Sequence, residues 1–414
     1  MDSGLTKSAF VLILGWRDVL NLGGQQRLIL NRASSLNDVY GISTLGLFVT
    51  SRKAQRRSGR TTVSGRGYHL VTFGFIGIWD LPVSIMNFIR VAYQWRKNSG
   101  LRAVIFSGKK IYPLGLLIRH MFSNIPLILD EDGIIEEAIE YGGPRRTLLD
   151  KLLSSLLGLA ERAMLRVADG ALVVSSGMAD YVRKRGCKRT ILVNCAVTKE
   201  NLMDVEKWTA VRERVRATMG WKGKTVFVFS GTMAPWQNLR RSSQLVKRYI
   251  DFTGSECILL LLTPQVNDAI MIATESLSRE EVFAMTADAS EVHRLLCASD
   301  VGLVLRDPSL TNAVAFPNKF SEYFAAGLLV ITSPGLQDPA RILKDNSLGL
   351  VVDPEDVCNR DFIDKLKDLV DQRGADLTSY YSRQYRIAWM EVNMDHQISR
   401  FADFLGTNRG PYVP

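Results

Sequence analysis

Short apolar runs alternate with helix-length amphipathic segments along the first half of the chain. Strands are predicted over 10–14, 45–50, 103–107, 126–130, 171–175 and 191–194. A long amphipathic helix is predicted over 148–168, and another helix is predicted to begin near Ser176. Strands that alternate with helices at this spacing predict parallel βαβ units with right-handed crossovers. The pattern therefore indicates an α/β fold.

The same alternation starts again near residue 205. A charged helical stretch over 207–219 precedes strands predicted at 225–229, 257–262, 302–305 and 329–332. The restart divides the 414 residues into two α/β domains, 1–205 and 206–384, which agrees with about 100–200 residues per domain. The last segment, about 385–414, is expected to be helical and to pack back on the first domain.

The net charge indicates possible partners, and the spacing of cysteines and histidines bears on disulfide and metal sites. The formal net charge of +10 suggests an anionic partner, such as nucleic acid, a membrane surface or a phosphorylated substrate. The sequence shows no helix-turn-helix, zinc-finger or aromatic–basic RNA motif, so no nucleic-acid partner is expected. The five cysteines form no CxxC pair and the four histidines form no HExxH motif, so we expect free thiols and no metal site. The sequence also contains no GxxxxGK[ST] motif, and no GxGxxG motif follows the first predicted strand.

Two segments of the first half bear on membrane contact. The apolar stretch over 70–89 contains Asp80 and Pro82, which argues against a spanning helix. A helix over 81–97 is predicted instead, either as an ordinary core helix or as one that lies in a lipid interface. The stretch Arg52–Arg66 has only basic charged residues and is rich in Ser and Gly. It predicts a mobile loop, either solvated or docked on an anionic membrane.

The densest polar pattern lies over 290–334, where a strand, a polar loop, a helix and a second strand follow one another. Arg306 and Lys319 place two cations at the carboxyl end of a strand and the start of a helix, where open α/β folds bind anionic ligands. Glu322 lies one helical turn beyond Lys319 and can accept hydrogen bonds from a ribose diol. A cation for phosphate and a carboxylate for ribose indicate a nucleoside diphosphate site. On spacing alone, a solvated Lys319–Glu322 pair, with Pro317 merely starting the helix, stays open as the alternative.

This segment resembles the C-terminal domain of retaining GT-B glycosyltransferases of family 4, and best fits the subgroup from capsule and exopolysaccharide biosynthesis. The resemblance rests on Thr311–Gly327 with the strand after it, Phe229–Thr232 with Trp236–Asn238, Leu129–Gly133 with Glu136 and Glu137, Ala171–Gly177, and Gly23-Gly24 between the first strand and helix. It covers nearly the whole chain and is strongest between residues 225 and 335.

The resemblance implies two Rossmann-like domains that face each other across a cleft, and transfer of a sugar with retention from a UDP- or GDP-sugar. The donor-binding residues that it implies are Gly23, Gly24, Ser230, Gly231, Asn312, Pro317, Lys319 and Glu322. It implies a catalytic role for Arg306, Lys319 and Glu322, and an acceptor-side position for Asp130, Asp132 and Glu136. No metal ion or other cofactor is implied, because cations and helix N-termini stabilise the leaving diphosphate. For Asp130 and Asp132, a turn stabilised by Asp and Gly and a metal site stay open as alternatives.

Two positions depart from the family pattern. Val314 stands where many members carry the first of two glutamates, and Gln237 or Asn238 replaces the usual phosphate-contacting lysine. These departures motivate two alternatives to an active transferase. One is a non-catalytic GT-B protein that acts as a partner or regulatory subunit, and the other is a GT-B nucleotide-sugar epimerase.

The resemblance implies a lipid-linked oligosaccharide acceptor in surface polysaccharide biosynthesis. Because Arg17 and Asp18 interrupt the apolar run over 9–14, no secretory signal is expected. The protein is then expected in the cytoplasm, where Arg52–Arg66 and the 81–97 helix would hold it peripherally on the inner face of the cytoplasmic membrane.

Overall fold

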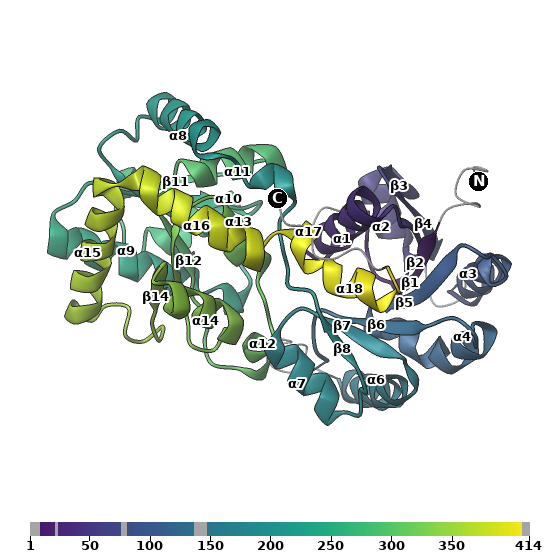
Figure 1. Ribbon diagram of the computed structural model, residues 1–414. Coiled ribbons are helices and arrows are strands. Elements are labelled where there is room, and N and C mark those ends of the chain that lie inside the picture. The colour runs from purple at the N-terminus through teal and green to yellow at the C-terminus, as the bar shows by residue number, and fades with distance from the viewer. Residues whose placement is uncertain (1–8, 21–23, 76–80, 136–146, 408–414) are drawn as a thin grey trace. The chain divides into compact units, whose positions relative to one another are not determined.

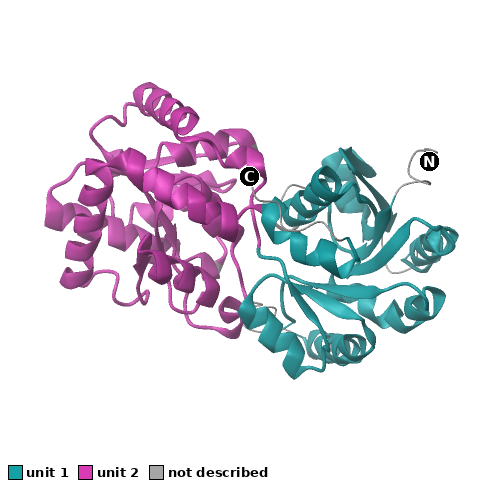
Figure 2. Ribbon diagram, in the orientation of Figure 1, with its two compact units in different colours: residues 1–194, 394–414 teal, residues 195–393 magenta. Residues whose placement is uncertain are grey.

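The computed structural model describes residues 9–20, 24–75, 81–135 and 147–407. The chain divides into two compact units, which Figure 2 shows in different colours. Unit 1 comprises residues 1–194 and 394–414, and unit 2 comprises residues 195–393. The boundaries expected from the sequence are 205/206 and 384/385.

Unit 1 is built on an eight-stranded sheet in the order β3-β4-β2-β1-β5-β6-β7-β8 (Figure 1). Neighbouring strands are parallel, except that β3 pairs antiparallel with β4. The strands are β1 (Phe10–Trp16), β2 (Ser43–Ser51), β3 (Thr62–Gly65), β4 (Tyr68–Phe75), β5 (Leu101–Ser107), β6 (Leu127–Glu131), β7 (Gly170–Val173) and β8 (Thr190–Leu192).

Helices cover both faces of this sheet. Their bounds are α1 (Gly24–Tyr40), α2 (Arg52–Ser58), α3 (Leu81–Trp95), α4 (Gly115–Met121), α6 (Leu148–Val167), α7 (Ser176–Lys184), α17 (Met394–Gln397) and α18 (Ser399–Phe404). The chain steps toward one sheet edge from β1 to β4 and toward the other edge from β4 to β8. Right-handed crossovers therefore place α1 on one face and α3, α4, α6 and α7 on the other. After the chain returns to unit 1, α17 packs on α1.

Unit 2 is built on a six-stranded, wholly parallel sheet in the order β11-β10-β9-β12-β13-β14. The strands are β9 (Thr225–Ser230), β10 (Cys257–Leu262), β11 (Val282–Met285), β12 (Val301–Val304), β13 (Leu329–Thr332) and β14 (Gly349–Val351). The helices are α8 (Val205–Met219), α9 (Leu239–Thr253), α10 (Val266–Ala273), α11 (Ala289–Cys297), α12 (Leu310–Ala313), α13 (Asn318–Ala325), α14 (Gln337–Asn346), α15 (Arg360–Ala375) and α16 (Leu377–Glu391). Counted along the chain, this strand order is the 3-2-1-4-5-6 order of doubly wound nucleotide-binding folds.

Continuous apolar composition explains why the central strands lie inside. All six residues of β10, CILLLL, are buried, as expected of a parallel strand that is covered on both faces. Close packing of α13 on β12 depends on Gly302, because a Cβ built there would collide with the ring of Tyr323. The α/β fold expected from the sequence is thus confirmed in both units.

The stretch Arg52–Arg66 differs from the predicted mobile loop. It forms α2, whose N-cap Ser51 accepts the Ala54 N–H at 3.3 Å, and then β3 at the sheet edge. None of the α2 residues is buried. The loop prediction is wrong because a basic, Ser- and Gly-rich composition signals exposure, which a short capped helix and an edge strand also satisfy.

The helix predicted over 81–97 is present as α3, and its Phe88 side belongs to the core. Phe88 and Ala92 are buried, and the Phe88 ring meets Phe73 of β4 edge-on, with ring centroids 6.1 Å apart. Within the described parts of the chain, no helix has the length and apolar character needed to cross a bilayer.

Candidate functional site

The candidate site lies in unit 2 at the point where the strand order reverses. β9 and β12 are neighbours there, and the chain leaves them in opposite directions across the sheet. Ser230 and Gly231 stand at the carboxyl end of β9, and Arg306 follows β12. In open parallel sheets, ligands bind in the crevice outside the strand ends at this switch point.

Arg306 is fixed by bonds to the surrounding loops. The residue is only 7% exposed. Its backbone N–H donates to Ser333 Oγ at 2.8 Å, and its Nη1 donates to the carbonyl oxygen of Trp236 at 2.7 Å. The segment that follows β13 thus fixes the backbone of Arg306, and the segment that follows β9 fixes its guanidinium.

Lys319 enters the same region from the first turn of α13. It is also 7% exposed, and its Nζ donates to Gln237 Oε1 at 2.5 Å. The ammonium lies 4.2 Å from the ring centroid of Phe229. Burial and the nearby Arg306 charge lower the pKa of Lys319 well below its usual range, and Glu322 opposes this only in part. Lys319 is therefore not the solvated partner of Glu322 that spacing alone allowed.

Gly231 lies beside Gln237 and Lys319 in this cluster. Its φ of +136° is one that side chains rarely adopt. A Cβ built there would lie 3.2 Å from Gln237 Nε2 and 3.4 Å from Lys319 Nζ. The glycine thus leaves room directly beside the buried ammonium, where a ligand can approach the backbone closely.

The remaining donor-side residues predicted from the sequence fall close to this cluster in the chain. Asn312 is buried and donates from Nδ2 to the Asp307 carbonyl at 2.8 Å, so it shapes the loop before α13. Pro317 is the N-cap residue of α13. Glu322 is half-buried one turn beyond Lys319. Val314, at the position of the missing glutamate, is 3% exposed.

Three contributors to the cluster were not predicted. The Tyr323 hydroxyl donates to Ser230 Oγ at 3.0 Å and accepts the Ser230 N–H at 2.6 Å, tying α13 to the end of β9. Ser333 Oγ and the Trp236 carbonyl hold Arg306. The one sequence signal was for Tyr323, because it lies four residues after Lys319 on the same helix.

The acceptor-side carboxylates predicted in unit 1 lie at the end of β6 and are ion-paired. Asp130 accepts from Arg32 Nη1 at 2.7 Å, and Asp132 accepts from both Nη atoms of Arg17, at 2.7 and 3.1 Å. Burial alone would raise the pKa of Asp132, but Arg17 beside it lowers that pKa overall. No group of His, Cys, Asp and Glu in the described chain could hold a metal ion.

A further ion cluster in unit 1 joins Lys109, which follows β5, to two buried carboxylates. Its Nζ donates to Glu131 Oε2 at 2.6 Å and also to Glu161 of α6. Tyr112 donates its hydroxyl to Glu131 Oε1 at 2.6 Å. Burial opposes the charge on Lys109, but the two carboxylates raise its pKa overall. Of the other unit 1 predictions, Gly24 is the first residue of α1, whereas Gly23 and Glu136 lie outside the described residues.

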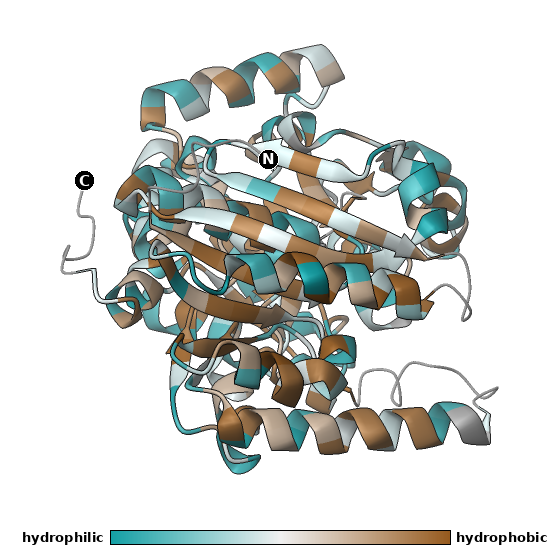
Figure 3. Ribbon diagram, turned by 90° about the vertical axis from the view of Figure 1, so that its right-hand side faces the viewer, coloured by the Kyte–Doolittle hydropathy of each residue, from teal (hydrophilic) through white to brown (hydrophobic). Residues whose placement is uncertain are grey.

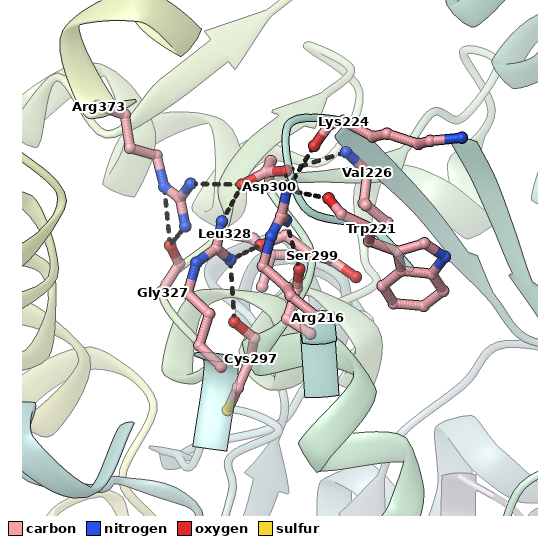
Figure 4. Close-up of polar contacts among 12 residues, drawn as sticks. Arg216, Trp221, Lys224, Val226, Cys297, Ser299, Asp300, Gly327, Leu328 and Arg373 are labelled. Atoms are coloured by element: carbon pink, nitrogen blue, oxygen red, sulfur yellow. Dashed lines mark hydrogen bonds and ion pairs between the residues drawn. The ribbon is translucent and has the colours of Figure 1, made fainter. Parts of the chain in front are cut away.

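A hollow of about 620 Å³ lies at the opposite, amino-terminal edge of the unit 2 sheet. Its wall includes Asp300, which precedes β12 and which Arg212, Arg216 and Arg373 surround (Figure 4). These guanidinium groups also donate to backbone carbonyls at the ends of α11 and α13. The arrangement anchors α8 and α15 to the sheet, and the strand ends that bind ligands in such folds lie at the other edge.

Comparison with known proteins gives structural likeness alone. No protein family model and no curated protein matches the chain. Sucrose-phosphate synthase from Thermosynechococcus elongatus matches with a TM-score of 0.65 at 15% identity, over 96% of this chain and 98% of that one. HepE from Anabaena, in complex with UDP-glucose, matches with a TM-score of 0.63 at 12% identity, over 96% and 99%. WaaG, a glycosyltransferase involved in lipopolysaccharide biosynthesis, matches with a TM-score of 0.65 at 12% identity, over 95% and 99%.

The chain has the GT-B fold. The GT-B fold expected from the sequence is therefore confirmed, and the two sheets described above are its two Rossmann-like halves. In this GT-B chain, the cluster of Arg306, Lys319 and Gly231 belongs to the half that lies second in the sequence.

Proposed function

We propose that this protein is a glycosyltransferase that moves a sugar from a UDP- or GDP-sugar to an acceptor hydroxyl. The observation that carries the proposal is the buried pair of cations, Arg306 and Lys319, at the switch point of unit 2. Burial disfavours charge on Lys319, and a diphosphate beside it would restore that charge. The GT-B neighbour HepE, crystallised with UDP-glucose and with UDP, supports a nucleotide-sugar ligand.

The cations act on the bond that breaks. The bond between the anomeric carbon and the diphosphate oxygen breaks, and its electron pair leaves with the diphosphate. The acceptor oxygen bonds to the anomeric carbon, and its proton passes to the diphosphate oxygen that leaves. Arg306 and Lys319 stabilise the charge that grows on the leaving group. Glu322 holds the ribose, and Gly231 lets the backbone lie close to the donor.

We further propose transfer with retention, as the resemblance to family 4 implies. We also propose that no metal ion is needed, because Arg306 and Lys319 supply the positive charge that a leaving diphosphate needs. Asn312 and Pro317 shape the donor loop before α13. The proposed acceptor is a lipid-linked oligosaccharide of a surface polysaccharide, oriented near Asp130, Asp132 and Glu136. WaaG, whose role is in lipopolysaccharide biosynthesis, supports this class of acceptor.

The burial of Val314 favours a second candidate function. A 3% exposed valine cannot supply the carboxylate that many family 4 members carry at this position. A GT-B protein that binds a nucleotide sugar without transferring it would fit this departure. An epimerase acting on the nucleotide sugar would fit the same site.

The deciding experiment offers the purified protein a panel of UDP- and GDP-sugars with a lipid-linked acceptor. We expect nucleotide release together with a glycosylated lipid whose anomeric configuration, read by NMR, matches that of the donor. Lys319→Ala should weaken nucleotide-sugar binding about 10- to 100-fold, as for the loss of a charged hydrogen-bonding partner. Lys365→Ala, an exposed lysine of α15, is the matched control and should bind as the wild type does.

Each alternative has its own signature in this assay. Binding with no release from any donor, unaffected by Glu322→Ala, would assign the protein to the non-catalytic class. Interconversion of the sugar without an acceptor would assign it to the epimerases. Unaltered affinity in Lys319→Ala, with an intact circular dichroism spectrum, would remove Lys319 from the site.

A further inference from the structure

A stripe of exposed leucines runs along α6 in unit 1. Leu152, Leu156 and Leu159 are 56%, 52% and 62% exposed. Their i, i+4, i+7 spacing puts them on one face of the helix. Buried apolar residues, including Met164 and Leu165, lie away from this stripe on the helix. A helix that is apolar on both faces normally has both faces buried. The exposed leucine stripe therefore indicates a surface that binds a partner.

The apolar surface continues onto α4. Leu116 and Leu117 of α4 are 59% and 50% exposed, and Leu153 of α6 is 49% exposed. α4 begins beside α6, because a Cβ built on Gly115 would collide with the Met164 side chain. Right-handed crossovers place both helices on the same face of the sheet. Figure 3 shows this side of unit 1, where brown residues extend along much of α6. Exposed apolar side chains that gather on one side of a unit in this way mark an interaction site.

A cationic hollow borders the leucine stripe. It has a volume of about 320 Å³, and its lining in the described chain consists of Arg162 and Arg166 of α6 with Lys184 and Arg185 at the end of α7. The Arg185 guanidinium lies 3.5 Å from the ring centroid of Tyr181, which holds it in place. All four lining side chains are positively charged. Arg185 already lies 3.8 Å from the buried Glu161 carboxylate, so Arg162, Arg166 and Lys184 supply the charge that selects an anion.

We propose that unit 1 docks on an anionic lipid bilayer through this surface, which we define as the α6 surface: the outer leucines of α4 and α6 with the cationic hollow. The leucines enter the boundary between headgroups and acyl chains, and the hollow takes a lipid phosphate. Apolar side chains beside a cluster of cations match what interfacial helices present to anionic membranes. A second copy of the chain would bring another cationic hollow to the same contact, so charge complementarity favours lipid.

The α6 surface differs from the membrane contact expected from the sequence, which used Arg52–Arg66 and the helix over 81–97. It also stands apart from the proposed transferase activity, because membrane binding is measured without any sugar donor.

Flotation with vesicles tests the proposal on the full chain. The wild type should float with vesicles of phosphatidylcholine and phosphatidylglycerol, less so as salt is raised, and should stay unbound with phosphatidylcholine alone. Arg162→Gln/Arg166→Gln should weaken binding about 25-fold, from roughly fivefold per cation near an anionic surface. Leu152→Gln/Leu156→Gln/Leu159→Gln should weaken it more than about 100-fold, because each leucine leaves an apolar contact. These side chains are exposed, so thermal melts should match the wild type.

Two control variants remove comparable groups elsewhere. Lys344→Gln/Lys365→Gln takes two exposed cations from unit 2, and Met271→Gln takes an exposed apolar side chain from it. Both should float as the wild type does.

Several results would overturn the proposal. These are no flotation of the wild type, or α6 variants that float unchanged. If Arg56→Gln/Arg57→Gln lost vesicle binding and the α6 variants kept it, the membrane contact would be assigned to α2 instead. If the leucine variant instead turned a dimer into a monomer in light scattering, with flotation unaffected, the surface would be an interface between copies.

Discussion

Replacing Asp300 with asparagine tests what holds unit 2 together at the amino-terminal edge of its sheet. The carboxylate accepts from Arg216 and Arg373 at 3.0 Å each, and also from Arg212 (Figure 4). It accepts the Val226 N–H at 2.9 Å as well. Asparagine keeps the shape of the side chain but removes its charge. Three guanidinium groups would then face one another without their shared anion.

The size of the effect follows from burial. Asp300 is 9% exposed, and the side chains of Arg212 and Arg373 are 8% and 4% exposed. Removing one partner of a buried ion pair costs about 3–5 kcal/mol. The asparagine oxygen can keep part of the hydrogen bonding, so we expect a loss near the lower limit, about 3 kcal/mol. Such a loss is a large part of the ~5–15 kcal/mol by which proteins are usually stable.

The effect should also depend on pH in a defined direction. Burial alone would raise the pKa of Asp300, but Arg212, Arg373 and Arg216 hold that pKa well below its usual range. In the unfolded chain, the carboxyl group titrates near pH 3.9. The stabilisation by Asp300 is therefore complete above about pH 4 and is lost as the pH falls through the folded-state pKa. The difference between wild type and variant should be constant near neutrality and should narrow in acid.

Urea unfolding, followed by circular dichroism, measures the free energy of unfolding and the m-value for each form. The matched control is Asp371→Asn, in the wall of the same hollow. Its carboxylate is 60% exposed and pairs with Lys367 one helical turn away, so its loss should change stability by about 0.5 kcal/mol or less. A loss of about 1 kcal/mol is average for a single substitution. If the free energy of unfolding of Asp300→Asn were within about 1 kcal/mol of the wild-type value, with an unchanged m-value, the argument from shared charge would be refuted.

Three further predictions concern the donor site. Burial and Arg306 lower the pKa of Lys319, and a diphosphate beside it would raise that pKa again. UDP binding should therefore take up protons at any pH between the two values. Calorimetry in buffers of different ionisation enthalpy, repeated over a range of pH, should detect the uptake, and Lys319→Met should abolish it. Gly231→Ala puts a Cβ beside the Lys319 ammonium at an unfavourable φ, so it should weaken nucleotide binding at least about tenfold. A wild-type affinity, measured by calorimetry, would contradict the close approach of the ligand to the Gly231 backbone. Tyr323→Phe removes two hydrogen bonds to Ser230 and should cost about 1–3 kcal/mol of stability, and an unchanged urea midpoint would show that α13 is held in another way.

How far the sequence predicted the fold depends on how deeply each strand is buried. The strands over 257–262 and 329–332 appear at the predicted bounds, because continuous apolar runs are the signature of strands buried on both faces. The edge strands β11 and β14 were not predicted. β14 is only half-buried and β11 is buried at a single residue, so neither shows a clear apolar pattern.

The site was predictable only in part, for a related reason. Arg306 and Lys319 follow from the sequence, since one lies at a strand end and the other at the start of the next helix. The roles of Tyr323 and Ser333 depend on how α13 is rotated and on how the loop after β13 runs, which spacing does not fix. Likewise, nothing local reveals that Arg17 lies against Asp132, because 115 residues separate them.

Two lysines with little exposure, half-buried Lys109 and buried Lys319, indicate which unit can take an anion. Lys109 and Lys319 each lie at the carboxyl ends of parallel strands, and burial disfavours the charge on both. Lys109 sits between Glu131 and Glu161, which more than offset burial and raise its pKa. Lys319 bonds to a neutral amide and has Arg306 nearby, so its pKa is lowered. A diphosphate would therefore gain little beside Lys109, where carboxylates already balance the charge and would repel it. Beside Lys319 the same ligand would supply the missing negative charge. The proposed donor is therefore expected in unit 2, and Glu131 and Glu161 are left to hold Lys109.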